Sequence, residues 1–123
     1  MSLDTSISPL VDTIVEIIET RKGEGLSVYS VGDSSTLTDY VILCSCASTP
    51  HIRAVTNAIS QDLKADKRLA TIQGAPESGW VIMDYGEAVI HILHPETREY
   101  YQLEELQPPS SLIYSVPVED EFA

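Results

Sequence analysis

The segment SGWVIMDYGEAVIHILHPETREYY, residues 78–101, is rich in side chains that enzymes use for catalysis. It holds a tryptophan, an aspartate, two histidines and an arginine. The chain's three histidines, His51, His91 and His94, lack the paired spacing that is typical of a zinc site. His91 and His94 are three residues apart where a strand is expected to end, so their rings should diverge. We therefore expect no metal site and no bound cofactor in this segment.

A second candidate chemistry is nucleotidyl transfer near Gly32. Such enzymes have a Gly-Ser turn followed, some ten residues on, by two carboxylates at positions i and i+2 of a strand. That spacing puts both carboxylates on one face, where they hold Mg²⁺ and a nucleotide phosphate. Here Asp33-Ser34 and then Asp39 follow Gly32, but the position two after Asp39 is Val41. We expect no enzyme, and a divergent metal-dependent nucleotidyltransferase stays as an alternative.

The two cysteines, Cys44 and Cys46, are separated by one residue. On a strand their side chains would share a face but point in parallel, which is poor geometry for a disulfide. We interpret them as small buried apolar side chains in a reducing, cytoplasmic compartment. The N-terminus resembles neither a secretory signal nor a transit peptide. No window approaches ~18 uninterrupted apolar residues, so we expect no membrane span.

Charge is distributed unevenly along the 123 residues. The net charge is −12, and the part from residue 77 to the end holds ten acidic residues and one base, Arg98, which gives −9. Such a surface repels phosphate backbones, so we expect no direct sequence-specific binding of nucleic acid. A basic protein is the favoured partner, although charge alone is also explained by solubility.

Periodicity and turn residues predict a single mixed α/β domain. Three helices are expected: one in 6–25 with Ser8 as its cap, one in 49–69 with Thr49 as its cap, and one in 94–106 that begins at Pro95. Strands are expected in 26–33, 38–48, 70–74, 80–84 and 88–94. The order α-β-β-α-β-β-β-α implies a mixed sheet of about five strands with helices packed on it. Residues 1–107 form the expected domain, and 108–123 an irregular acidic tail.

Two features of this arrangement stay open. The strands 80–84 and 88–94 should form a hairpin, with Gly86 in its turn. A two-residue loop would pair Trp80 with His91, whereas a three-residue loop would shift that register by one. In the tail, Leu112, Ile113 and Tyr114 either dock on the body or do not.

A binding surface explains more residues of the hairpin than an active site does. Aromatic side chains cluster there with carboxylates: Trp80, Tyr85, Tyr100, Tyr101, Asp84, Glu87, Glu96 and Glu99. Aromatic rings supply contact area at low entropy cost, and surrounding carboxylates select basic partners. The alternative for Trp80 is core packing. That alternative is weaker for Tyr85, because hairpin tips usually face water.

Three stretches, TDYVILCSCASTPHIRAV, GWVIMDYGEAVIHILHPETREYYQLEEL and the first helix, resemble the ribosomal silencing factor family, also called the Iojap family. The resemblance runs from about residue 8 to residue 107. The chain departs from the family pattern at Cys46, where a glycine is usual, at Pro50, where a polar residue is usual, and in its longer tail. The resemblance implies an α/β fold with nucleotidyltransferase-like topology but without the catalytic pair.

The resemblance also implies a function. Members bind the large ribosomal subunit through the basic ribosomal protein number fourteen (uL14), block joining of the small subunit and so repress translation when nutrients are scarce. Members are also linked to large-subunit assembly, and they tend to form homodimers. The partner-binding residues that the motif implies are Trp80, Asp84, Tyr85, Glu87, His91 and His94. Asp39 and Tyr40 are implied to hold the sheet edge and its loop.

Overall fold

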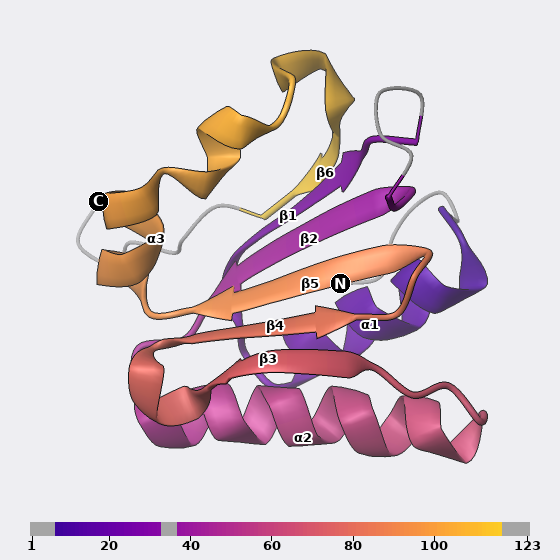
Figure 1. Cartoon of the computed structure of the whole chain (residues 1–123), viewed down its shortest axis with the longest axis vertical. Helices are drawn as coiled ribbons and strands as arrows, with labels where there is room; N and C mark the ends of the chain where they lie inside the picture. Colours follow the sequence, from indigo (N-terminus) through magenta and orange to yellow (C-terminus); the bar gives the residue numbers. More distant parts are fainter. Residues whose placement is uncertain (1–6, 33–36, 117–123) are drawn as a thin grey trace.

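A computed structural model describes residues 7–32 and 37–116 of the chain (Figure 1). Its helices and strands are α1 (Pro9–Thr20), β1 (Glu24–Ser30), β2 (Tyr40–Ser45), α2 (Thr49–Ala65), β3 (Thr71–Ala75), β4 (Trp80–Asp84), β5 (Ala88–Leu93), α3 (Pro95–Tyr101) and β6 (Leu112–Ser115). Three short 3-10 helices are η1 (Pro76–Ser78), η2 (Leu103–Leu106) and η3 (Pro109–Ser111). Among the described residues, no helix combines the length and apolar character needed to cross a bilayer.

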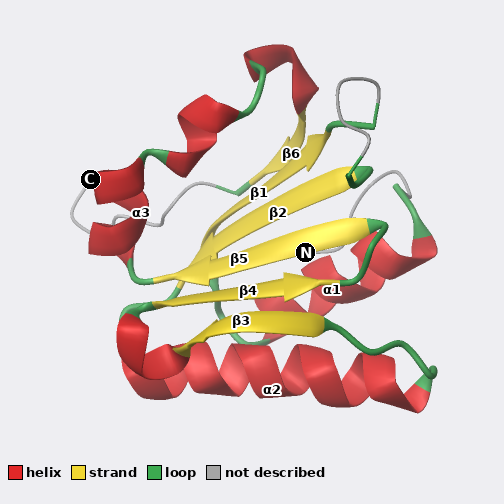
Figure 2. Cartoon of the chain, viewed as in Figure 1, coloured by secondary structure: helices red, strands yellow, loops and turns green. Residues whose placement is uncertain are grey.

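In the described part of the chain, the six strands form one mixed sheet in the order β3-β4-β5-β2-β1-β6 (Figure 2). β2 and β5 run parallel at its centre, and the other neighbouring strands are antiparallel. This confirms the predicted α/β class. The apolar run from Val41 to Cys44 lies in the central strand β2, and every one of its side chains is buried, as is typical of a strand covered on both faces.

The two long helices cover one face of the sheet and supply its main core. α1 buries Leu10, Val11, Ile14, Val15 and Ile18, and α2 buries Ile52, Val55, Ile59 and Leu63. These side chains pack against alternate strand residues such as Val28, Ile42 and Ile90. Both cysteines belong to this core, with no exposed surface, as expected. These buried residues recur at helical spacing, so each helix presents one apolar stripe to the covered face.

The helix ends match the predictions for α1 but not for α2. Ser8 caps α1, and its hydroxyl accepts a hydrogen bond from the Val11 amide at 3.1 Å. The predicted cap of α2, Thr49, is wrong: Ser48 takes that place and accepts from the His51 amide at 3.2 Å. Ser48 is extended, whereas Thr49 is already the first helical residue. Two adjacent hydroxyl residues before a proline leave the cap position ambiguous in the sequence.

The segment 108–123 is only partly described, and its described part is not irregular. Residues 112–115 form β6, which pairs antiparallel with β1, Tyr114 opposite Val28. Tyr114 packs against the main core, and its hydroxyl donates to Glu19 Oε2 at 2.7 Å. Within residues 7–32 and 37–116, the sheet therefore has six strands rather than about five. The acidic run Glu119 to Glu121 lies outside the described residues.

Candidate functional site

The second face of the sheet is only partly covered. Leu103 of η2 packs there against Tyr29, Leu43 and Leu93, so the segment 95–106 covers the part of the face over β1 and β2. Beyond this cover, Trp80, Ile82, Val89 and His91 are half-buried rather than fully buried. They come from the neighbouring strands β4 and β5. This open part of the sheet is the candidate binding surface, and we call it the open face.

The centre of the open face is an aromatic group around Trp80. The Trp80 ring lies with its centroid 5.0 Å from that of Tyr101 and 6.0 Å from that of His91. The indole Nε1–H donates to His91 Nδ1 at 3.2 Å. Tyr101 is itself in edge contact with Tyr100, whose side chain is 80% exposed. Strands and helix together thus hold the rings of Trp80, Tyr100 and Tyr101 in contact with solvent, so three of the four aromatic side chains grouped in the sequence lie together.

The hairpin register is neither of the two considered. Trp80 pairs with Leu93 and Asp84 with Val89, so Ile82 rather than Trp80 lies opposite His91. The turn closes further out, where the Tyr85 amide donates to the Ala88 carbonyl at 2.9 Å. Gly86 adopts φ +83°, as its place in a turn predicts. Residues two apart on a strand share a face, so Trp80 still reaches His91 diagonally.

The structure separates Asp84 from Tyr85. Asp84 is exposed and shares the face of Trp80, and its Oδ1 accepts from the Gly86 amide at 2.8 Å. Tyr85 turns to the opposite face and packs against the main core. Its hydroxyl is buried without a hydrogen-bond partner among the described residues, and burial raises its pKa. The expectation that the tip position leaves Tyr85 in water is therefore wrong, because the ring folds under the sheet.

The remaining motif residues have local partners. Glu87 Oε1 lies 3.7 Å from Nη1 of Arg68, which follows the end of α2. Its carbonyl accepts from the amides of Asp39 and Tyr40, both at 3.0 Å, which ties the start of β2 to the hairpin turn. His94 caps α3, and its Nδ1 accepts from the Glu96 amide at 3.2 Å. The sequence-based set thus divides: the open face gathers Trp80, Asp84 and His91, and the other residues lie around it.

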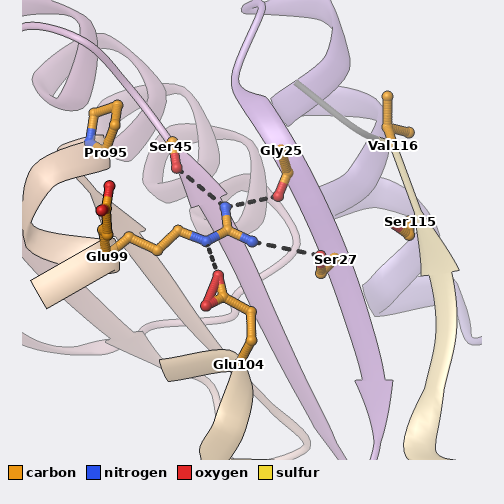
Figure 3. Close-up of a pocket in the computed structure, with 9 residues that line it drawn as sticks. Gly25, Ser27, Ser45, Pro95, Glu99, Glu104, Ser115 and Val116 are labelled. Carbon is orange, nitrogen blue, oxygen red and sulfur yellow. Dashed lines mark hydrogen bonds and ion pairs between the residues drawn. The ribbon is translucent and has the colours of Figure 1, made fainter. Parts of the chain in front are cut away.

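Arg98 is a residue whose role sequence reasoning missed. It reaches from α3 to the strands, where Nη1 donates to the Gly25 carbonyl at 2.7 Å and to Ser45 Oγ at 3.0 Å. Its Nε pairs with Glu104. Figure 3 shows these partners around a pocket of about 430 Å³. The available signal in the sequence was a lone base among ten acidic residues, because an arginine that is largely buried and paired accounts for a base in such a segment.

A shallow hollow of about 470 Å³ adjoins the Trp80 ring. Its lining comes from β3, η1, β4 and α3: Gln73, Gly74, Ser78, Trp80, Ile82, Thr97 and Tyr101. Among the residues that the structure describes, no charged side chain lines it. Within the described ranges, no three histidine, cysteine or carboxylate side chains lie close enough together to hold a metal ion. The arrangement is suited to receiving an apolar side chain of a partner, with the Asp84 carboxylate further along the same strand.

The family model "Ribosomal silencing factor during starvation" matches residues 4–120. The chain belongs to the ribosomal silencing factor family. Ribosomal silencing factor RsfS of Haemophilus influenzae is 32% identical over 98 residues, covering 79% of this chain and 96% of the relative. The mouse protein "Mitochondrial assembly of ribosomal large subunit protein 1" is 31% identical over 100 residues, 78% of this chain and 44% of the mouse protein.

Solved structures share the fold of this family member. A crystal structure of a Chromobacterium violaceum protein superposes with a TM-score of 0.77 at 23% identity, covering 97% of this chain and all of that one. A Bacillus halodurans protein gives a TM-score of 0.74, also at 23% identity, over 85% of this chain and 96% of its own. The family match extends to residue 120, past the predicted domain end at 107, and so includes β6.

Proposed function

We propose that this protein represses translation by binding the large ribosomal subunit through the basic ribosomal protein number fourteen (uL14) and blocking small-subunit joining. Membership of the ribosomal silencing factor family supports a ribosomal role. No bond is made or broken in this mechanism. A compact domain of this length has a radius of gyration of about 14 Å, so it would keep two rigid surfaces apart wherever it sits between them.

The open face is the observation that carries the proposal. Its half-buried apolar side chains meet solvent beside an uncharged hollow, although the opposite face of the same sheet is covered by α1 and α2. Aromatic residues at the centre of such a surface usually contribute most of the binding free energy. A net charge of −12 favours a basic partner and faster encounter with it. The face thus has the chemistry expected for docking on a basic protein.

Substituting Trp80 tests this assignment. Trp80→Ala should weaken binding to purified large subunits by about 1–3 kcal/mol, because the ring supplies the centre of the docking surface. Binding is measured by co-sedimentation in a gradient and by titration on immobilised subunits, and circular dichroism checks that the fold is retained. Leu112→Ala is the matched control, since it removes exposed apolar surface at the opposite edge of the sheet. Equal affinity of Trp80→Ala and wild type would refute the contact.

A second candidate function is assembly of the large subunit. The mouse relative's own name describes such a role in mitochondria. Particle profiles of cells that lack the protein separate the two functions. Accumulated large-subunit precursors in growing cells would favour assembly, whereas excess joined ribosomes only in starved cells would favour silencing.

A further inference from the structure

The hydrogen bond between Trp80 and His91 determines which nitrogen of the His91 ring carries the proton. A neutral imidazole accepts a hydrogen bond only through its unprotonated nitrogen. The indole donates to Nδ1 at 3.2 Å, so the His91 proton lies on Nε2. A second proton would have to enter at Nδ1, where it would meet the indole N–H. The hydrogen bond and the charged form of His91 therefore exclude each other.

We propose that His91 is a positioning residue for Trp80: its neutral imidazole holds the indole ring against Tyr101 in the orientation that docks, and protonation of His91 releases the ring. The docking consequence rests on the proposed function, whereas the coupling of the two side chains does not. His91 then acts through Trp80 rather than by touching the partner. Docking should accordingly weaken as the pH falls.

The surroundings of His91 favour its neutral form. Its register neighbours are Ile82 on β4 and Leu43 on β2, neither of which ionises. Burial lowers the pKa of His91 below its ordinary value. The strands and helices around it carry these ionisable groups: Glu24 and Tyr29 on β1, Tyr40 and Cys44 on β2, Asp84 on β4, Glu96, Arg98, Glu99, Tyr100 and Tyr101 on α3, and Glu104 and Glu105 on η2.

These neighbours do not supply a counter-ion to His91. Arg98 and Glu104 are paired with each other, so their charges largely cancel. Glu96, Glu99 and Glu105 are exposed, and water screens their carboxylates. Asp84 lies diagonally across from His91 at the exposed end of β4, where water screens its carboxylate. The imidazolium form therefore lacks a stabilising partner, and its appearance on acidification should coincide with loss of the indole contact.

Because Trp80 is the only tryptophan, its fluorescence reports this coupling directly. In wild type, the Trp80 emission should change in one step between pH 7.5 and 5, with a midpoint below about 6.5. His91→Asn places an amide oxygen near the position of Nδ1 and cannot be protonated there, so its emission should stay constant. His51→Asn is the matched control on α2, and the wild-type step should persist in it. Far-UV circular dichroism over the same range excludes unfolding.

Binding to purified large subunits supplies the second readout. Wild type and the His51→Asn control should both lose affinity about three- to tenfold between pH 7.5 and 5.5. The affinity of His91→Asn should stay constant over the same pH range. His91→Leu should bind about three- to tenfold more weakly at pH 7.5, since it lacks the acceptor.

The outcomes separate the two proposals. A fluorescence step that survives in His91→Asn would overturn the coupling. A step that depends on His91 with wild-type affinity in His91→Leu at pH 7.5 would overturn the positioning role. No binding by any variant at any pH would refute the proposed function while leaving the fluorescence result to stand by itself.

Discussion

Tyr85 is the residue whose environment is predicted least well from its position in the chain. It follows a strand and precedes a glycine turn, a place that normally faces water, yet its ring packs against the main core. The alternation of strand residues continues one position past β4, so Tyr85 shares the covered face of Val81 and Met83. The alternation along the strand therefore predicts that Tyr85 packs on the covered face, whereas its position in a turn predicts that it faces water.

The buried hydroxyl of Tyr85 leads to a stability prediction. Tyr85→Phe removes a polar atom that has no hydrogen-bond partner among the described residues, and keeps the ring. We expect the free energy of unfolding to rise by up to about 1 kcal/mol, because the desolvation cost disappears. Urea denaturation measures this change. Tyr114→Phe serves as the comparison, since the Tyr114 hydroxyl donates a hydrogen bond to Glu19 Oε2 at 2.7 Å; a loss in Tyr85→Phe as large as the loss there would contradict the prediction.

Among the helices and strands, α3 is held in place by contacts that the sequence does not predict. None of its seven residues has a fully buried side chain, so packing against the sheet stabilises this short helix only weakly. Arg98 ties it to β1 through Gly25 and to β2 through Ser45. Tyr101, at the end of the same helix, contacts Trp80. The position of α3 thus determines one side of the open face.

Replacing Arg98 should loosen this helix. Arg98→Met removes the hydrogen bonds to both strands and leaves Glu104 unpaired, so we expect a loss of about 2–4 kcal/mol of unfolding free energy. Amide hydrogen exchange in 95–106 should accelerate more than exchange in α2. Arg53→Met breaks the ion pair with Glu77 on the surface and should cost less than about 1 kcal/mol. Similar losses in the two variants would contradict the proposed role of Arg98.

Comparison of elements shows what the sequence predicts and where it stops. Stripes such as Ile52 to Leu63 and the cap Ser8 identify α1 and α2 because their signals are local. Hairpin register and β6 depend on partners far along the chain. Leu112 to Ser115 become a strand because β1 offers them an unpaired edge, and four residues between 3-10 helix and proline carry no periodicity of their own. For the site, composition indicated Trp80 and His91, but not that they bond to each other.

At the scale of the whole molecule, charge should govern the rate of partner encounter. The double variant Asp84→Asn with Glu87→Gln should slow association with large subunits most at low salt, because it removes two charges beside the docking surface. Stopped-flow mixing at several salt concentrations measures the rate. Glu16→Gln with Asp62→Asn removes the same charge between α1 and α2, on the covered side of the sheet. If both pairs slow association equally, net charge rather than the open face directs the encounter.

The pairing of β1 with β6 has a consequence for how the protein folds. Ser27 lies opposite Ser115, so this ladder joins residues 88 positions apart. The parallel pair β2–β5 likewise encloses α2, β3 and β4 between its strands. Such distant contacts close large loops and favour slow folding, on a millisecond-to-second scale. A nascent chain would expose the edge of β1 until residues 112–115 have been synthesised, so this part of the sheet should close late.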